Sequence, residues 1–258
     1  MLLDLDGVVW RGDEPIPGAA AAIARLVAGG WRVAYFTNNS YPPLATHLAK
    51  LERIGVHATA ENFLTSAQAA AVCCAPNERV LVLGGDGICE ALREAGIAAS
   101  AITDECEPLG ARAPDADVVV VGIDPQLSYR RLAVAAGAIR RGARFVATNA
   151  DATFPTPDGL VPGAGSLVAA LQVASGAEPR VAGKPAEPAA ELVRRRLGVP
   201  DYVVGDRPAT DGLLAERLGA RFALVLSGVT PPGHGPLELS PAHEDRDLAA
   251  FAERLLAP

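Results

Sequence analysis

Short apolar runs recur along the chain, and each is closed by polar or glycine residues. Most of these runs are apolar at consecutive positions, which is typical of strands buried on both faces of a parallel sheet. Segments with the apolar spacing of helices separate them, among them Ala19–Ala28 and Ser128–Arg141. The pattern predicts an α/β fold with parallel sheets. Strands are expected at Leu2–Leu5, Trp31–Phe36, Val80–Leu83, Val118–Val121, Phe145–Ala147, Tyr202–Val204 and Phe222–Leu226.

Chain length and the positions of breaking residues indicate two domains. The chain has 258 residues, which is long for one ordinary domain. Proline, asparagine and glycine interrupt the periodic segments near Pro76–Asn77 and again near Gly176–Glu178. We therefore predict a Rossmann-like parallel-sheet core made of residues 1–76 and 179–258, with an α/β domain of residues 77–178 inserted into it.

The charge balance restricts the partners of the protein. Its 23 Lys and Arg residues against 30 Asp and Glu residues give a net charge of −7, which repels nucleic acid and anionic membrane surfaces. An enzyme of an anionic substrate would need a metal ion or a few local cations to reverse this field. No apolar run approaches the roughly 18 residues of a membrane span. No leader precedes Leu2 either, so we expect a cytoplasmic protein.

The four cysteines lack the spacing of a metal site. Cys73, Cys74, Cys89 and Cys106 form no paired C-x-x-C motif, and no histidine lies near enough in sequence to complete a zinc site. We expect reduced, buried thiols.

Two carboxylates follow the first predicted strand. Asp4 and Asp6 flank Leu5, so the two-residue period of an extended chain places both side chains on the same side. Ligands of open α/β sheets bind at this carboxyl end of the strands. The alternative is a simple turn at Asp6-Gly7, because that dipeptide is common in turns.

Two further strand ends carry polar groups. Thr37 and Asn38 end the second strand and offer a hydroxyl and a backbone N–H to an anionic oxygen, or else they cap the helix expected from Pro43 onward. Lys184 follows a short strand expected at Arg180–Ala182, and it is either a functional cation or an ordinary surface lysine.

Two more carboxylates lie near the end of the chain. Asp206 ends an apolar strand, and Asp211 begins the helix expected at Gly212–Leu218. Mg²⁺ prefers hard oxygen ligands, and two carboxylates at this point suit it. A helix N-cap also explains Asp211, but it leaves Asp206 unexplained.

In chain order these strand ends deliver Asp-x-Asp, Thr, Lys and Gly-Asp-x₄-Asp, and this order resembles the haloacid dehalogenase superfamily. Over essentially the whole chain, the sequence is similar to the nitrophenylphosphatase-like branch of that superfamily, which has a large α/β cap (type IIA). It departs from the usual pattern at Gly212, where a bulky apolar residue is common. The similar segments are Asp4-Leu5-Asp6-Gly7-Val8, Thr37-Asn38-Asn39-Ser40, Thr148-Asn149-Ala150-Asp151, Pro162-Gly163-Ala164-Gly165-Ser166-Leu167, Gly183-Lys184-Pro185 and Gly205-Asp206-Arg207.

The resemblance implies a Mg²⁺-dependent phosphatase that works through an aspartyl-phosphate. Asp4 would be the nucleophile, and Asp6 would protonate the leaving alkoxide and later activate water. Mg²⁺ would be bound by Asp4, by Asp206 and by the backbone carbonyl of Asp6. Asp211 would hold a metal-bound water. The groups expected to bind phosphate oxygens are Thr37, the Asn38 N–H and Lys184.

The cap loop Thr148–Pro157 is expected to contact the leaving group of the substrate. Asn149 and Asp151 offer hydrogen bonds to hydroxyls, and Asp151 would repel a second negative charge unless Arg or Lys lies close. Phe154 would narrow the pocket, or else it merely packs the cap. These residues favour a small phosphomonoester, glycerol 3-phosphate or phosphoglycolate, over a nucleotide, a sugar phosphate or pyridoxal 5′-phosphate. A homodimer is left open.

Two other classes of protein compete with this interpretation. The strand Val80–Leu83 runs into Gly84-Gly85-Asp86-Gly87, but the G-x-G-x-x-G spacing of a dinucleotide-binding loop is missing. A non-catalytic binding protein would be indicated by loss of Asp4 or Asp6, and both are present.

Overall fold

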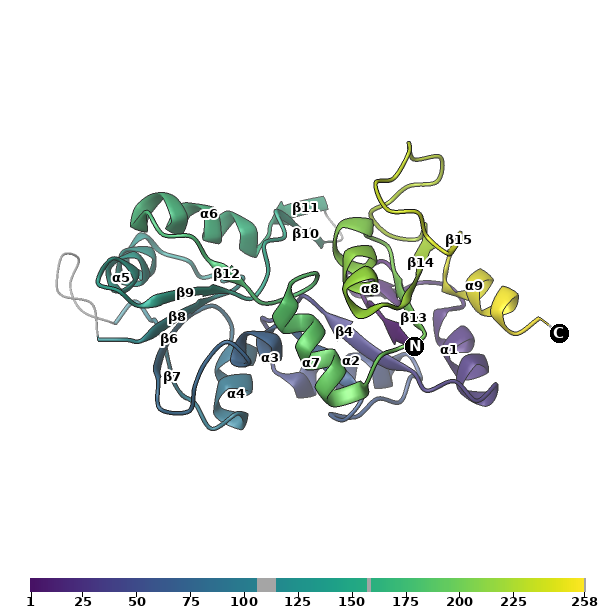
Figure 1. Cartoon of the computed structure of the whole chain (residues 1–258), viewed down its shortest axis with the longest axis horizontal. Helices are drawn as coiled ribbons and strands as arrows, with labels where there is room; N and C mark the ends of the chain where they lie inside the picture. Colours follow the sequence, from purple (N-terminus) through teal and green to yellow (C-terminus); the bar gives the residue numbers. More distant parts are fainter. Residues whose placement is uncertain (106–114, 157–158, 258) are drawn as a thin grey trace.

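Two parallel sheets dominate the computed structural model, which describes residues 1–105, 115–156 and 159–257 (Figure 1). Every neighbouring pair of strands within these two sheets is parallel, so the predicted fold class is confirmed. The larger sheet has the strand order β15 (His243–Asp245), β14 (Arg221–Val225), β13 (Tyr202–Gly205), β1 (Leu2–Leu3), β4 (Ala34–Thr37) and β5 (Phe63–Thr65). The smaller sheet has the order β12 (Arg180–Val181), β9 (Arg144–Ala147), β8 (Val118–Val121), β6 (Arg79–Leu83) and β7 (Ala98–Ala101).

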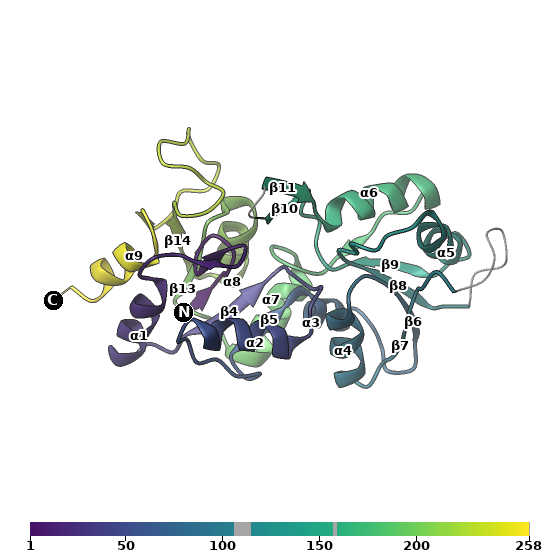
Figure 2. The ribbon, with the colours of Figure 1, turned by 180° about the vertical axis from the view of Figure 1, so that it is seen from behind.

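Helices cover both faces of each sheet (Figures 1 and 2). One face of the larger sheet packs against α1 (Ala19–Ala28), α2 (Leu44–Arg53) and α9 (Leu248–Leu255). Its other face packs against α3 (Ser66–Ala71), α7 (Glu187–Leu197) and α8 (Leu213–Leu218). The smaller sheet lies between α4 (Asp86–Glu94) on one side and α5 (Tyr129–Arg140) and α6 (Ala164–Ser175) on the other.

The consecutive apolar residues of each strand explain this layering. Side chains alternate between the two faces of a strand, so Leu2 packs with α3, α7 and α8 while Leu3 packs with α1, α2 and α9. In the smaller sheet Val80 and Leu81 divide in the same way. Each such buried side chain stabilises the fold by roughly 1.5–3 kcal/mol relative to an exposed one.

The two sheets share one hydrophobic core. Phe36 and Leu64 of the larger sheet belong to the same buried cluster as Val82 and Val118 of the smaller sheet. The helices α3 and α4 pack against each other where the two lobes meet. The lobes are therefore joined by packing as well as by the two chain crossings.

The glycine-rich segment after β6, Gly84–Gly87, packs against the loop after β4 of the larger sheet. A Cβ atom at Gly85 would overlap the main chain of Tyr41, so this position accepts only glycine without displacement of the chain. The close approach accounts for a glycine that superficially suggested a cofactor loop.

The predicted division into residues 1–76, 77–178 and 179–258 stays a prediction. The chain passes from the larger to the smaller sheet between α3 and β6. It returns only after Val181, because β12 pairs with β9 of the smaller sheet. Arg180 and Val181 thus belong to the smaller sheet, although the prediction placed them in the second core segment.

Several elements differ from the sequence-based expectation. β1 ends at Leu3, because the carbonyl oxygen of Leu5 already accepts hydrogen bonds from the N–H groups of Val8, Val9 and Trp10 in a tight turn. The loop behind this turn contains the short hairpin β2 (Trp10–Arg11) and β3 (Glu14–Pro15). A second hairpin, β10 (Thr153–Thr156) and β11 (Gly159–Pro162), lies between the two lobes in both views (Figures 1 and 2). The expected helix at residues 212–218 is preceded by one π-helical turn, Pro208–Gly212.

The structure also bears on the expectation of reduced, buried thiols and on the search for membrane-spanning segments. Cys73, Cys74 and Cys89 are free thiols, and burial raises the pKa of each, that of Cys74 to about 12. Cys106 lies outside the described residues. Among the helices that the structure describes, none combines the length and apolar character needed to cross a membrane.

The buried histidine of α2 makes stability depend on pH. His47 stacks on Phe63 with 5.3 Å between ring centroids, and its Nε2 has no hydrogen-bond partner among the described residues. Burial lowers the pKa of His47 to about 4, although a hydrogen bond to the Asn39 backbone opposes the shift. The folded state therefore binds fewer protons than the unfolded state between pH 6.5 and 4.

We expect the wild-type protein to lose stability relative to a His47→Leu variant as the pH falls through this window, by up to about 1.4 kcal/mol per pH unit. Urea denaturation at pH 7, 6, 5 and 4 measures the difference. The matched control is His57→Leu, whose parent side chain is 83% exposed. Parallel pH profiles for wild type and His47→Leu would contradict the assignment.

Candidate active site

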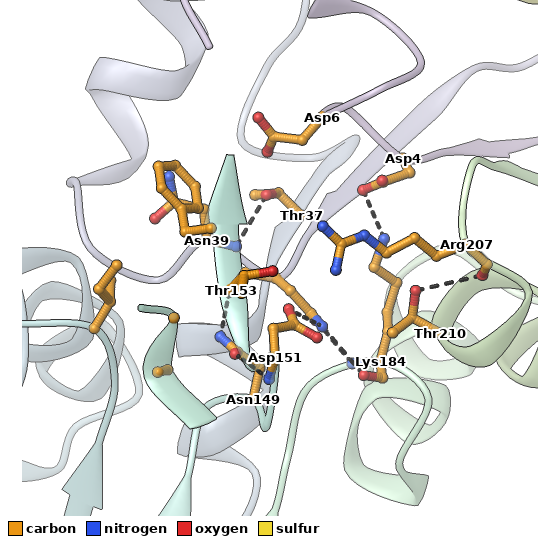
Figure 3. A pocket seen from close by; sticks show the side chains of 15 residues that line it. Asp4, Asp6, Thr37, Asn39, Asn149, Asp151, Thr153, Lys184, Arg207 and Thr210 are labelled. Atoms are coloured by element: carbon orange, nitrogen blue, oxygen red, sulfur yellow. Dashed lines mark hydrogen bonds and ion pairs between the residues drawn. The ribbon is translucent and has the colours of Figure 1, made fainter. Parts of the chain in front are cut away.

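One pocket opens at the carboxyl end of the larger sheet, beside the smaller lobe (Figure 3). Asp4 and Asp206 directly follow the adjacent strands β1 and β13, and Thr37 ends β4 on the other side of β1. The loop after β12 brings in Lys184, and the loop after β9 supplies the cap residues. The predicted site residues that line this pocket are Asp4, Asp6, Thr37, Asn38, Asn149, Asp151, Phe154 and Lys184.

Lys184 forms the charged centre of the site. Its Nζ is buried and donates hydrogen bonds of 2.7 Å to Asp4 Oδ1 and 2.7 Å to Asp211 Oδ1. Burial alone lowers the pKa of Lys184, but the Asp211 and Asp4 carboxylates raise it overall, so the ammonium stays charged. The alternative of a surface lysine at Lys184 is therefore wrong. The alternative of a helix N-cap at Asp211 is wrong as well, because Asp211 lies inside the π-helical turn Pro208–Gly212, whose N-cap is Arg207.

Asp206 is held rigidly by one of its two carboxylate oxygens. Its Oδ2 accepts a hydrogen bond of 2.5 Å from the Val229 N–H, and its carbonyl oxygen accepts one of 2.6 Å from Thr230 Oγ1. Its Oδ1 is buried and has no partner among the described residues. A buried carboxylate oxygen without a donor is costly unless a cation meets it.

The carboxylates around Asp206 fit a divalent cation. Asp4, Asp206 and Asp211 each place one oxygen within 4.8 Å of the others. With all three ionised and one ammonium beside them, the cluster carries two surplus negative charges. Burial raises the pKa of Asp206 to about 6 and also raises that of Asp4, with further upward shifts from neighbouring carboxylates. Hard oxygen donors and an excess of negative charge are what Mg²⁺ requires.

Asp6 faces the same pocket from the loop after β1. The Trp10 Nε1–H donates a hydrogen bond of 3.1 Å to Asp6 Oδ1, which fixes the carboxyl group. Burial raises the pKa of Asp6, and the positive charge of Lys50 opposes this shift. The turn at Asp6-Gly7 also exists, with Gly7 at a φ of 87°. The turn and the pocket-facing carboxyl group thus occur together, and a carboxyl group that keeps its proton to higher pH is suited to general acid catalysis.

Thr37 offers a hydroxyl to the pocket. It is buried, and its Oγ1 accepts a hydrogen bond of 3.0 Å from the Asn39 N–H, so its own hydrogen can point to another acceptor. The alternative of a helix cap is wrong, since the N-cap residue of α2 is Pro43 and the N–H of the first helical residue, Leu44, donates to Glu90.

The Asn38 side chain joins the core to the cap. Its Oδ1 accepts a hydrogen bond of 2.9 Å from the Lys184 N–H, and its Nδ2 donates to the Lys184 carbonyl at 3.1 Å. The same Nδ2 donates to Asp151 Oδ2 at 3.2 Å. Sequence considerations assigned only the backbone N–H of Asn38. The structure adds that its amide fixes the main chain of Lys184.

The three predicted cap residues, Asn149, Asp151 and Phe154, line the pocket but differ in their contacts with the rest of the protein. The Asn149 amide is engaged with the main chain, donating to Asn38 O at 2.8 Å and accepting from the Asp151 N–H at 3.1 Å. Burial raises the pKa of the Asp151 carboxyl, and the hydrogen bond from Asn38 opposes this. Phe154 lies on β10 and lines the pocket. Contact of these residues with a substrate stays a prediction.

Arg207 is a pocket residue to which no role was assigned from the sequence. It lines the cavity together with Ile123, Thr153 and Thr210. The available signal was its position directly after Asp206, at the same strand end. A cation in this pocket weakens the expected discrimination against a charged leaving group, because that expectation assumed that neither Arg nor Lys lies near Asp151.

Comparison with known proteins places this site in a family. Residues 1–98 match a family model described as haloacid dehalogenase-like hydrolase, and residues 181–250 match one described as HAD-hydrolase-like. The chain is 37% identical over 273 residues to the D-glycerol 3-phosphate phosphatase of Mycobacterium tuberculosis, covering 98% of this chain and 73% of that protein. It is 36% identical over 239 residues to the 5′-nucleotidase YutF of Bacillus subtilis, covering 90% and 89%.

Solved structures agree with the sequence relatives. The p-nitrophenyl phosphatase from Archaeoglobus fulgidus matches with a TM-score of 0.85 at 30% identity, over 98% of this chain and 97% of that one. The glycerol phosphate phosphatase from Mycobacterium tuberculosis in complex with magnesium matches with a TM-score of 0.85 at 36% identity, over 99% and 78%. The chain belongs to the haloacid dehalogenase superfamily, in its nitrophenylphosphatase-like branch with a large α/β cap. The prediction of a Mg²⁺-dependent phosphoric monoester hydrolase is confirmed at this level.

The packing of Gly228 against Asp206 gives a test of the metal site. A Cβ atom at Gly228 would overlap Oδ2 and Cγ of Asp206, so the whole carboxylate, with its unpartnered Oδ1, would have to move. We expect Gly228→Ala to raise the Mg²⁺ concentration for half-maximal activity by about tenfold or more, as for other changes that misplace a metal ligand.

Magnesium titrations of activity and of the melting temperature measure this effect. Gly235→Ala is the matched control, because nothing lies within 4 Å of the added Cβ. Equal Mg²⁺ requirements for the two variants would show that the Asp206 carboxylate does not hold the metal.

Proposed function

We propose that this protein hydrolyses glycerol 3-phosphate, or a similarly small ester such as phosphoglycolate, through an aspartyl-phosphate on Asp4. The observation that carries the proposal is the buried cluster in which Lys184 bridges Asp4 and Asp211 beside the unpartnered Oδ1 of Asp206. The name of the Mycobacterium tuberculosis relative supports the choice of glycerol 3-phosphate.

In the first step, Asp4 forms a bond to phosphorus while the ester oxygen leaves. The contact with Lys184 engages Oδ1 of Asp4 and leaves Oδ2 for attack. The leaving oxygen takes its proton from the Asp6 carboxyl group. Donors from Thr37, the Asn38 N–H and Lys184 hold the remaining phosphoryl oxygens, where charge develops in the transition state.

In the second step, Asp6 is a carboxylate and takes a proton from water as the water oxygen bonds to phosphorus. The bond between phosphorus and Asp4 breaks, which restores the Asp4 carboxylate and the protonated Asp6. Asp4, Asp206 and the Asp6 carbonyl would hold Mg²⁺, which would supply the positive charge that offsets repulsion between the phosphate and the carboxylates.

The dimensions and lining of the pocket support a small leaving group. The cavity measures about 60 Å³, well below the roughly 300 Å³ at which sites for larger ligands begin. Phe154 and Ile123 limit it, and Asp151 offers a hydrogen-bond acceptor to hydroxyls. Nucleotides, sugar phosphates and pyridoxal 5′-phosphate are the weaker alternatives. Cytoplasmic location belongs to the same proposal, and a homodimer stays open.

Removal of the nucleophile tests the proposed mechanism. We expect Asp4→Asn to abolish turnover without unfolding the protein, because the change is nearly isosteric and removes only the attacking charge. Initial rates with a small phosphomonoester and the melting temperature give the two readouts. Asp13→Asn is the matched control in the same loop, since the Asp13 side chain is 85% exposed. More than a few per cent of wild-type activity in Asp4→Asn would rule out Asp4 as nucleophile.

The order of substrates tests the proposed specificity. We expect kcat/KM for glycerol 3-phosphate or phosphoglycolate to exceed that for pyridoxal 5′-phosphate and UMP, because the small cavity excludes rings unless the cap moves. Release of free phosphate with Mg²⁺ measures all four. An advantage of tenfold or more for pyridoxal 5′-phosphate or UMP would overturn the proposed substrate class.

A further inference from the structure

The Arg207 side chain enters the active-site pocket from a rigid base (Figure 3). Its N–H donates to Asp211 Oδ2 at 3.3 Å, and its carbonyl oxygen accepts from the N–H groups of Thr210 at 3.1 Å and Asp211 at 2.8 Å. The π-helical turn after β13 therefore fixes the point from which the side chain starts.

The Arg207 guanidinium has no hydrogen-bond or ion-pair partner in the part of the chain that the structure describes. All hydrogen bonds of Arg207 to other described residues involve its main chain, and no ion pair of its side chain occurs among them. A guanidinium carries five N–H donors in a planar fork that matches carboxylates and paired oxygen atoms. A half-buried cation with these donors unused is suited to a ligand that brings oxygen atoms.

Asp151 offers the opposite chemistry from the cap. Its carboxylate accepts a single hydrogen bond, from Asn38 Nδ2, among the described residues, and so it retains acceptor capacity. Its main-chain N–H is bonded to Asn149, which fixes the loop. The pocket thus presents a donor from the core at Arg207 and an acceptor from the cap at Asp151, with Thr153 and Phe154 beside them.

We propose that Arg207 and Asp151 form a leaving-group subsite for short phosphorylated polyols and hydroxy acids. Arg207 donates hydrogen bonds to oxygen atoms of the leaving group, and Asp151 accepts hydrogen bonds from its hydroxyls. The proposal rests on the proposed phosphatase function and assigns its specificity to two named side chains.

The subsite distinguishes the two candidate substrates. The two hydroxyls of a glycerol leaving group can each donate and accept, so together they satisfy both Arg207 and Asp151. The carboxylate of a glycolate leaving group pairs with Arg207 and is repelled by Asp151. Arg207 therefore makes phosphoglycolate acceptable, while Asp151 sets the preference for glycerol 3-phosphate.

Paired variants test the subsite. Arg207→Met removes the cation at similar length, Asp151→Asn removes the anion, and Arg195→Met, whose parent side chain is 68% exposed, is the control. The substrates are glycerol 3-phosphate, phosphoglycolate and ethyl phosphate, which is small enough for the same cavity and whose leaving group carries neither a carboxylate nor a further hydroxyl. We expect Arg207→Met to lower kcat/KM about tenfold or more for the first two relative to the third. Asp151→Asn is expected to raise the ratio of phosphoglycolate to glycerol 3-phosphate by a similar factor.

A binding measurement separates the subsite from the proposed reaction. In the non-hydrolysing Asp4→Asn background, calorimetry with phosphoglycolate should give a Kd about tenfold higher when Arg207→Met is added. A tenfold higher Kd supports the subsite even if the wild-type protein hydrolyses neither small ester. Absence of hydrolysis would overturn only the proposed substrate. An equal fall for all three substrates, an unchanged Kd, or no binding in the Asp4→Asn background would overturn the subsite.

Discussion

The buried contact of Lys184 with Asp4 and Asp211 is the constraint on which the site depends. A buried ammonium is tolerated only where carboxylates meet it, and here each lies at 2.7 Å. The three residues come from different segments: the end of β1, the turn after β13 and the loop after β12. Their interaction fixes the chain at the point where it returns from the smaller lobe to the larger one. It also leaves surplus negative charge beside Asp206, which accounts for the need for Mg²⁺.

The same constraint couples catalysis to specificity. Asn38 binds both main-chain polar groups of Lys184 and also the carboxylate of Asp151. A displacement of the cap loop would therefore act on the main chain that positions the lysine. Because the two lobes also share a hydrophobic core, the pocket is built from both of them. In the proposed mechanism, the strand ends of the larger sheet supply the reacting groups, and side chains at the boundary with the smaller sheet bind the leaving group.

The sequence predicts local features of this arrangement and misses the long-range ones. Buried strands such as Val118–Val121 and the helix Ala19–Ala28 are recovered, because an apolar run or a helical period is a local property. The positions of Asp4 and Thr37 follow from the rule that ligands gather at strand ends. The amide contacts of Asn38 and the unpartnered guanidinium of Arg207 depend on residues more than 100 positions away or on the absence of partners. The position of Arg207 after Asp206 could have drawn attention to it, but neither the contacts of Asn38 nor the unpartnered state of Arg207 can be predicted from the pattern of residue types.

Phosphoryl transfer through Asp4 would determine the stereochemical course at phosphorus, which can be measured. Each in-line displacement inverts the configuration at phosphorus. Transfer to Asp4 followed by attack of water gives two inversions and therefore net retention. A substrate whose phosphoryl group is made chiral with oxygen isotopes and sulfur, hydrolysed in labelled water, should give a product with retained configuration. Inversion would show a single direct attack by water and would contradict the account.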